Sequence, residues 1–398
     1  RMEPTAANLV YWLTHTTQQL FTPLTMYSLL LDRWLFGMVP AGFHLHSLVL
    51  FCVAAVLLFL ILRHLGVAGW IACVCTLLWL AHPQRVPSVI WISERKDILV
   101  AVCSLAAVWV YMRACDKGKV SWLAAVFFFL SLAAKPAAVA LPGIMALYTL
   151  YRYNGEWRRL RLVLPTLISG GIYAVFFMFV QNSAAQPFHP VIDWARFGLV
   201  ACHNSMWYFL TCFIPYQLNP IYPLVSVHFY DFLGTFCGGF AVLTLSGLAV
   251  AMTGIGAKKG WLFFLTLALA WGCFFIPLSG VILIGLTDYC DRYNLMLSAV
   301  ACAYAALIIA MLNRKFQGRF RVFAVTVALL MLVFYWWRTW SYMPYWSDSK
   351  SLLTKASEWP YPNPAALGNL AAVGINRDDP ELIESVAAQF FSLQLNVA

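Results

Sequence analysis

Apolar residues fill long runs along most of the chain, and short polar segments separate these runs. The runs lie near residues 43–62, 69–80, 98–112, 122–134, 137–150, 162–180, 232–252, 261–284, 295–312 and 322–337. An α-helix needs about 20 apolar residues to cross the hydrocarbon core of a bilayer, and flanking residues can extend the shorter runs. The pattern therefore predicts an all-α polytopic membrane protein with about ten transmembrane helices.

Composition and charge agree with this prediction, and the charge also indicates which loops lie on the inner side of the membrane. The chain has 398 residues, of which 62% are hydrophobic and 11% charged, and its net charge is +10. Soluble domains carry roughly 25% charged residues. Alternating the loops between two sides places "RACDKGK", "RYNGEWRRLR", "GAKKG" and "NRKFQGRFR" together, which is typical of the inner side of a membrane. This explains the basic charge, and nucleic acid is not an expected partner.

One segment departs from simple alternation, and the tail differs from the rest of the chain in composition. Residues 195–223 are apolar, but a crossing there would move "GAKKG" to the outer side. We therefore expect a re-entrant or interfacial helix that lies beside a cavity. From residue 341 the chain is polar, broken by prolines and then helical in its spacing. The expected domains are a membrane domain over 1–340 and a short helical tail over 341–398.

Charged residues also gather on the outer side, most densely in "HPQRVPSVIWISERKD" at 82–97. Each ionisable group costs roughly 2.5–3.5 kcal/mol at membrane depth, and such groups usually mark a site or a pathway. A lipid phosphate would supply counter-charge, because Arg binds phosphate bidentately and Lys acts as a point charge. The outer cations are Arg85, Arg95, Lys96, Lys135, Arg196 and Arg292, and the outer acids are Glu94, Asp97, Asp193, Asp288 and Asp291.

A structural explanation stands beside each of these candidates. The stretch 94–97 could begin an ordinary solvated helix in which the acids balance the basic pair. Lys135 could extend its ammonium to the membrane interface as a snorkelling side chain. Asp288, Asp291 and Arg292 could close a loop through local ion pairs, and His82 could be a hydrogen-bonded boundary residue. The convergence of all of them on one side favours a binding site.

Several segments also resemble a known family. They are "FTPLTMYSLLLD", "FHLHSLVL", "HPQRVPSVIWISERKDIL", "AAKPAAVALP", "GVILIG" and "DYCDRY". Their order resembles bacterial membrane proteins with tetratricopeptide-repeat tails, which are similar to the eukaryotic transmembrane-and-tetratricopeptide-repeat O-mannosyltransferases. "SERKD" resembles the bacterial branch, and "YWSDSKSLLTKASEWPYPNPAALGNLA" resembles the junction into a first repeat. The resemblance covers nearly all of the membrane part.

The resemblance implies a GT-C-like glycosyltransferase fold in the bacterial inner (plasma) membrane, with a periplasmic C-terminus. Such an enzyme moves a sugar from a polyprenyl-phosphate-linked donor to a periplasmic acceptor, either a protein or a glycan. A divalent metal, Mg²⁺ or Mn²⁺, stays open as a cofactor. By motif, the resemblance implies a donor site lined by Arg85, Glu94, Arg95, Lys96, Lys135, Asp291 and Arg292. The five cations would hold the phosphate, and Glu94 and Asp291 would orient the sugar or a metal. His82, His203, Asn204 and Tyr293 are expected to line the substrate.

The chain departs from the family at the catalytic acid, which lies in an acidic pair after a first transmembrane helix. Neither that helix nor that pair precedes "AANLVYWLTHTTQQLFTPLT" here. Either the segment lies outside this sequence, or Glu94, Asp288 and Asp291 are the candidate catalytic carboxylates. The second case leaves open a non-catalytic membrane subunit that works with a partner protein. A lipid or polysaccharide transporter is a third alternative, but it predicts internal repeats that the sequence does not display.

Overall fold

The computed structural model describes residues 3–16, 20–182, 194–215, 218–222, 269–272, 274–275, 289–358 and 363–395. Within these ranges the chain forms helices and no strand, which confirms the all-α prediction for this part. Its helical stretches that are long and apolar enough to cross a membrane are Pro40–His64, Ile92–Cys115, Trp157–Val180, Asp291–Phe316 and Phe320–Trp346. The predicted crossing at 232–252 lies outside the described residues, as does most of the one at 261–284, so ten crossings and a GT-C-like fold stay predictions.

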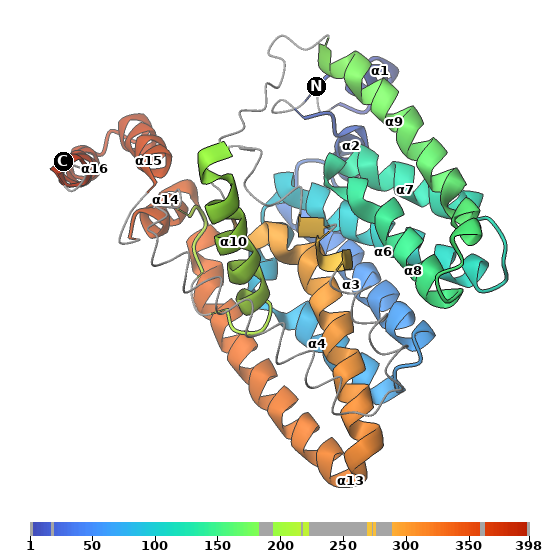
Figure 1. Ribbon diagram of the computed structural model, residues 1–398. Coiled ribbons are helices and arrows are strands. Elements are labelled where there is room, and N and C mark those ends of the chain that lie inside the picture. The colour runs from blue at the N-terminus through green and yellow to red at the C-terminus, as the bar shows by residue number, and fades with distance from the viewer. Residues whose placement is uncertain are drawn as a thin grey trace.

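The first part of the chain folds into a helix bundle (Figure 1). Its helices are α1 (Ala6–Thr14), α2 (Pro23–Phe36), α3 (Pro40–His64), α4 (Gly69–Ala81), α5 (Val86–Ile90), α6 (Arg95–Cys115), α7 (Trp122–Ala134), α8 (Leu141–Arg152) and α9 (Leu164–Asn182). Helix α6 is central, because it packs against both α3 and α7. Ala101, Ala107 and Ala124 are fully buried there, and small residues let helices approach closely within a membrane. A hydrogen bond of 2.7 Å between the hydroxyls of Ser104 and Ser131 joins α6 to α7.

Helix α13 (Asn294–Tyr342) contains two of the predicted crossings in one helix of 49 residues. A straight helix of that length would extend about 73 Å. Instead, the Tyr342 hydroxyl at its end donates a hydrogen bond of 3.4 Å to Oδ2 of Asp291, just before its beginning. The helix therefore folds back on itself, and Figure 1 shows its two arms meeting at a bend. The bend lies in the predicted loop 313–321, which keeps its helical hydrogen bonds.

The described basic loops share one end of the bundle. Asp116, just after α6, accepts from Nε of Arg152 at 2.8 Å and contacts Nε2 of His64 at 2.9 Å. The Arg321 guanidinium, at the bend of α13, lies 5.4 Å from the ring centre of Trp70. These contacts join the ends of α3, α6 and α8 to one another and the bend of α13 to the start of α4. The segment 82–97 precedes α6 and so lies at the other end, while "GAKKG" is outside the described residues.

Two further parts lie beside the bundle. Helix α10 (Trp194–Thr211) occupies the start of the segment predicted to be re-entrant or interfacial, and it packs against α13. The tail forms α14 (Ser349–Ser357), α15 (Pro364–Asn376) and α16 (Pro380–Leu395) around a small apolar core. The Asn363 amide donates to the Tyr222 carbonyl at 3.1 Å, which ties the tail to the bundle near α10 (Figure 1). Helix α13 crosses the expected domain boundary at residue 340.

Candidate functional site

The segment 82–97 changes direction several times before it enters α6. It forms a 3₁₀ turn at Pro83–Arg85, the short helix α5, and a second 3₁₀ turn at Ile92–Glu94. The His82 Nδ1 atom caps the first turn by accepting a hydrogen bond from the Gln84 backbone N–H at 3.3 Å. Proline at the start of each of the first two elements lacks an N–H that would need a partner. Successive charged side chains consequently point to different parts of the bundle.

One group of side chains forms a compact charged cluster, which consists of Glu94, Lys96, Asp97, Lys135 and Arg292. Lys96 Nζ lies 3.1 Å from Glu94 Oε1, and Arg292 Nε lies 3.6 Å from Glu94 Oε2. Lys135 Nζ lies 2.5 Å from Asp97 Oδ1. The exposed fraction of these side chains ranges from 6% at Glu94 to 19% at Arg292. The fold thus brings five ionisable residues from three distant parts of the sequence into one largely buried site.

Two cations of the charged cluster, Arg292 and Lys135, lie against aromatic rings. The Arg292 guanidinium carbon lies 5.4 Å from the ring centre of Trp91 and 5.2 Å from that of Tyr293. Lys135 Nζ lies 4.8 Å from the same Tyr293 ring. Contacts of this kind stabilise a cation by about 0.5–2 kcal/mol, and more strongly when water is excluded. Tyr293 therefore lies beside the charged cluster, and its place along a substrate stays a prediction.

The charged cluster contains three cations and two carboxylates, which leaves one positive charge without a counter-charge among its members. Within the described residues, Glu94 Oε2, Asp97 Oδ2 and Arg292 Nε have no hydrogen-bond partner. Although burial disfavours the charged ammonium, the Asp97 and Glu94 carboxylates raise the pKa of Lys135 above its ordinary value. The lysine is consequently charged at neutral pH, and the cluster can bind an anionic group.

Arg95 does not join the charged cluster, although it lies next to Lys96 in the sequence. Its side chain is fully buried, and its Nε donates to the Ser47 hydroxyl at 3.0 Å while Nη2 donates to the Phe43 carbonyl at 2.6 Å. Its Nη1 binds the carboxylate of Asp32, which in turn contacts His46. These contacts fasten α2 and α3 to the start of α6. The motifs do not point to Asp32 for this role; the one signal is an acid that ends the apolar run "SLLLD".

Arg85 and His82 point into the bundle on another side. Arg85 Nη2 donates to the Ser298 hydroxyl at 2.5 Å, and its guanidinium carbon lies 5.4 Å from the Trp79 ring centre. Burial lowers the pKa of Arg85 to about 10, so it stays protonated at neutral pH. Burial first, and then the charge of Arg85, lower the pKa of His82 well below its ordinary value. His82 is consequently a neutral imidazole.

Asp291 lies in a third group, which we call the Asp291 network and which consists of Gln84, Tyr222, Asp291, Asn294 and Tyr342. Oδ1 of Asp291 accepts from the Gln84 amide at 2.9 Å and from the Tyr222 hydroxyl at 3.0 Å. Asn294 donates to the Gln84 side-chain oxygen at 2.9 Å. Asp291 is 1% exposed and forms no ion pair with the described residues. The network holds the backbone from which the neighbouring Arg292 reaches the charged cluster.

The remaining predicted residues are placed as follows. His203 and Asn204 lie on α10, where Asn204 is buried and the His203 ring lies 5.3 Å from that of Tyr289. They pack beside the segment that leads into Asp291. Asp288 lies outside the described residues, as do Asp193 and the Arg196 side chain. In the described part, no group of three or more His, Cys, Asp or Glu residues could hold a metal ion, and a metal stays a prediction.

Comparisons of the chain with protein-family models, with curated proteins and with solved structures found no match in any of the three. These comparisons therefore assign the chain to no family.

Proposed function

We propose that this chain is a GT-C-type glycosyltransferase of the bacterial inner membrane, whose charged cluster binds the phosphate of a polyprenyl-phosphate-linked sugar. The observation that carries the proposal is the excess positive charge of the cluster, buried at one end of an apolar bundle. Removing five ionisable groups from water is costly unless their charges are matched. An anionic head group attached to a lipid would complete this balance without leaving the membrane.

The reaction breaks the bond between the anomeric carbon and the phosphate oxygen and forms a bond from that carbon to an acceptor hydroxyl. Negative charge grows on the departing phosphate, so fixed cations beside it stabilise the transition state. Arg292 and Lys135 are the cations in position for this role. The proton of the acceptor hydroxyl passes to a carboxylate. Glu94 is our candidate, because its Oε2 accepts no hydrogen bond from the described residues.

Two of the predicted site residues, Arg95 and Asp291, act indirectly under this proposal. Arg95 fastens the segment that carries Glu94, Lys96 and Asp97, and Asp291 fastens the segment that carries Arg292. Both are positioning residues, because their polar atoms are engaged by protein groups. The tail would face the periplasm, where an acceptor could reach it.

Donor binding tests the proposal directly. Purified full-length protein is titrated with a polyprenyl-phosphate-linked sugar, with and without Mg²⁺ or Mn²⁺. We expect saturable binding that weakens at least about tenfold in Arg292→Ala and in Lys96→Ala, since each loses a charge-assisted contact. Arg321→Ala, which removes a cation at the opposite end of the bundle, is the matched control. Equal donor affinity in all four proteins would refute the proposal.

A second candidate is a non-catalytic membrane subunit that holds a lipid-linked anion for a partner enzyme. The favouring observation is that both carboxylates of the charged cluster contact cations, at 3.1 Å for Glu94 and 2.5 Å for Asp97. A paired carboxylate is a weak base. The test uses the purified full-length gene product. If it binds the donor but transfers no sugar to an acceptor, this candidate is favoured over the enzyme.

A further inference from the structure

The basic end of the bundle carries more positive charge than its own acids balance. Its loops 113–119 and 152–161 contain Asp116 and Glu156 as their only acids. Asp116 Oδ1 lies 2.8 Å from Nε of Arg152, and Glu156 Oε2 lies 3.3 Å from Nε of Arg159. The cations of these loops that form no ion pair with a described residue are Arg113, Lys117, Lys119, Arg158 and Arg161. A negatively charged partner would supply the missing counter-charge.

The two loops touch, so their cations lie on one rim of the bundle. The Tyr153 hydroxyl donates to the Cys115 carbonyl at 2.6 Å. A Cβ atom added at Gly118 would lie 3.6 Å from the Tyr153 hydroxyl and 3.8 Å from Nη1 of Arg159. The turn at Gly118 therefore packs against the segment that follows Tyr153. We use the name basic rim for the exposed cations of these touching segments, Lys117, Lys119, Arg158 and Arg161.

Exposed tryptophans lie beside the basic rim. Trp157 is 70% exposed, and the Arg158 guanidinium carbon lies 5.8 Å from its ring centre. Trp122 is 61% exposed and begins α7, shortly after Lys119. Tryptophan side chains concentrate at the head-group level of a bilayer. The tryptophans therefore favour a position of the basic rim at the depth of the lipid phosphates.

Exposed apolar side chains continue from the basic rim along α9. Arg161 lies in the 3₁₀ segment Trp157–Val163, which runs directly into α9. Leu164 and Ile168 are each 51% exposed, and they follow Arg161 at intervals of three and four residues. Residues at these intervals share one face of a helix. The cation of Arg161 and an uncovered apolar face are therefore aligned on the same side of one helical segment.

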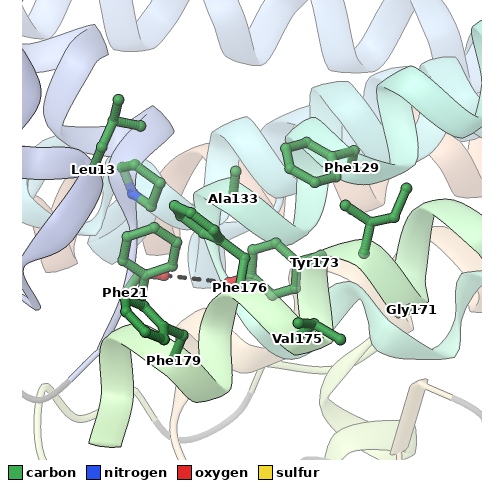
Figure 2. Close-up of a pocket in the computed structure, with 11 residues that line it drawn as sticks. Leu13, Phe21, Phe129, Ala133, Gly171, Tyr173, Val175, Phe176 and Phe179 are labelled. Carbon is green, nitrogen blue, oxygen red and sulfur yellow. Dashed lines mark hydrogen bonds between the residues drawn. The ribbon is translucent and has the colours of Figure 1, made fainter. Parts of the chain in front are cut away.

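This exposed face differs from the face of α9 that packs on α7. The Ser169 hydroxyl donates to the Ala125 carbonyl of α7 at 2.8 Å. One turn further along, Tyr173 is 5% exposed, and its hydroxyl donates to the Phe21 carbonyl at 3.4 Å, as Figure 2 shows. Residues 169 and 173 lie roughly 140° around the helix from residues 164 and 168. The packed face thus contacts protein, whereas the exposed face can contact a lipid.

We propose that the basic rim binds the phosphate of an anionic phospholipid whose acyl chains lie along the exposed face of α9. Phosphate oxygens accept charge-assisted hydrogen bonds from Lys and Arg, and basic sites at this level recognise lipid head groups. A lipid is the occupant because the cations adjoin an apolar face, which a soluble phosphate would leave uncovered. Zwitterionic lipids carry their own cation and would not supply the missing charge. The site lies at the opposite end of the bundle from the charged cluster and does not rest on the proposed function.

The test measures lipid binding to the purified full-length protein in a neutral detergent. The protein is titrated with phosphatidylglycerol or with phosphatidylcholine, and native mass spectrometry counts the bound lipids. In the parent we expect phosphatidylglycerol to bind at least about tenfold more tightly than phosphatidylcholine. Arg158→Gln/Arg161→Gln should remove most of this preference. Arg158→Lys/Arg161→Lys keeps both charges and should behave like the parent.

The matched control is Arg314→Gln/Arg321→Gln, which removes the same charge from exposed positions at the bend of α13. It should retain the preference of the parent, because these arginines lie outside the basic rim. Lys119→Gln tests the other loop of the basic rim. It should lose part of the preference, and it keeps the proposal testable even where the double Arg variant folds poorly.

Folded basic-rim variants that keep the full preference would overturn the proposal. So would equal affinity of the parent for both lipids. Equal weakening in the two Gln double variants would show a diffuse attraction to positive charge instead of a site. Glycerol 1-phosphate carries the phosphate without acyl chains, and we expect it to bind at least about a hundredfold more weakly than phosphatidylglycerol. Equal affinity for these two probes would assign the basic rim to a soluble phosphate and overturn the lipid.

Discussion

Lys135 Nζ lies 2.5 Å from Asp97 Oδ1, and this contact joins the residue after α7 to the first turn of α6. The two side chains are 12% and 8% exposed. Asp97 also benefits from the partial positive charge at the start of α6. The pair is thus both a packing contact between helices and one half of the proposed phosphate site.

Breaking this pair from one side should destabilise the protein strongly. Lys135→Met leaves the Asp97 carboxylate buried without its partner, which costs about 3–5 kcal/mol in comparable pairs. The double variant Lys135→Met/Asp97→Leu removes both charges and should be more stable than the single variant. Unfolding in denaturant, followed by circular dichroism, gives the comparison. A double variant that is less stable than the single one would contradict the assigned ion pair.

The contribution of this lysine should persist to high pH. Its pKa is raised in the folded protein above the ordinary value of about 10.4. The stabilisation is therefore fully present below that value and is lost only as the pH rises through the higher folded pKa. Between pH 7 and 10, the stability difference between the parent and Lys135→Met should stay constant. A difference that shrinks within this range would contradict the assignment.

Arg95 should matter for folding more than for ligand contact. Arg95→Lys cannot reproduce the forked contacts to Ser47, Phe43 and Asp32, and we expect a loss of about 3 kcal/mol or more. The donor affinity of the protein that remains folded at low temperature should stay within about twofold of the parent. Calorimetry and donor titration on the same sample provide both numbers. An unchanged melting temperature with lost donor binding would instead make Arg95 a direct ligand.

Acid should destabilise the protein through His82. Burial keeps the folded pKa of His82 well below the ordinary value of about 6.5, so the unfolded chain binds the proton first. Stability therefore falls as the pH drops below 6.5, by up to about 2 kcal/mol at pH 5. His82→Asn retains an oxygen that can cap the turn at Gln84 and does not titrate. The melting temperature of this variant should fall less between pH 7 and pH 5 than that of the parent.

The Asp291 network offers a graded test. Tyr342→Phe removes one hydrogen bond to Asp291, the 3.4 Å contact to Oδ2, and should cost about 1 kcal/mol. Gln84→Leu removes the donor to Asp291 and also the acceptor for Asn294, and should cost about 2–4 kcal/mol because two buried polar groups lose a partner. Chemical unfolding ranks the two variants. Equal losses would show that Gln84 does not link the two residues.

The helices could be predicted from the apolar runs to a large extent. The expected run 122–134 coincides with α7, and the expected run 69–80 ends one residue before α4 does. The reason is that backbone groups in a bilayer have to bond within their own helix, so the limits of an apolar run set the limits of the helix. The continuous helix through the basic loop 313–321 was not predicted, because a polar segment between two apolar runs is typical of a loop, and the runs themselves do not show how the chain is joined between them.

The grouping of charged residues was harder to predict. Arg95 and Lys96 are neighbours in the sequence, but they belong to different clusters because adjacent helical residues point in different directions. The role of Asp32 depends on a partner 63 positions away, and residue spacing does not reveal such a pairing. Gln84 and Tyr222 carry no charge, so a search for ionisable groups passes over them. Their importance follows only from the geometry around Asp291.

The bend of α13 places the far end of its second arm at a long distance from the bend, so that a small rotation at the bend moves this end by a large distance. The arm from Phe320 to Tyr342 extends about 35 Å, and it connects the bend to the tail helices. A rotation of one degree at the bend would move the far end by roughly 0.6 Å, so about five degrees would separate Tyr342 from Asp291. A small displacement among the basic loops would thus be amplified at the opposite end of the bundle, where Arg292 is held.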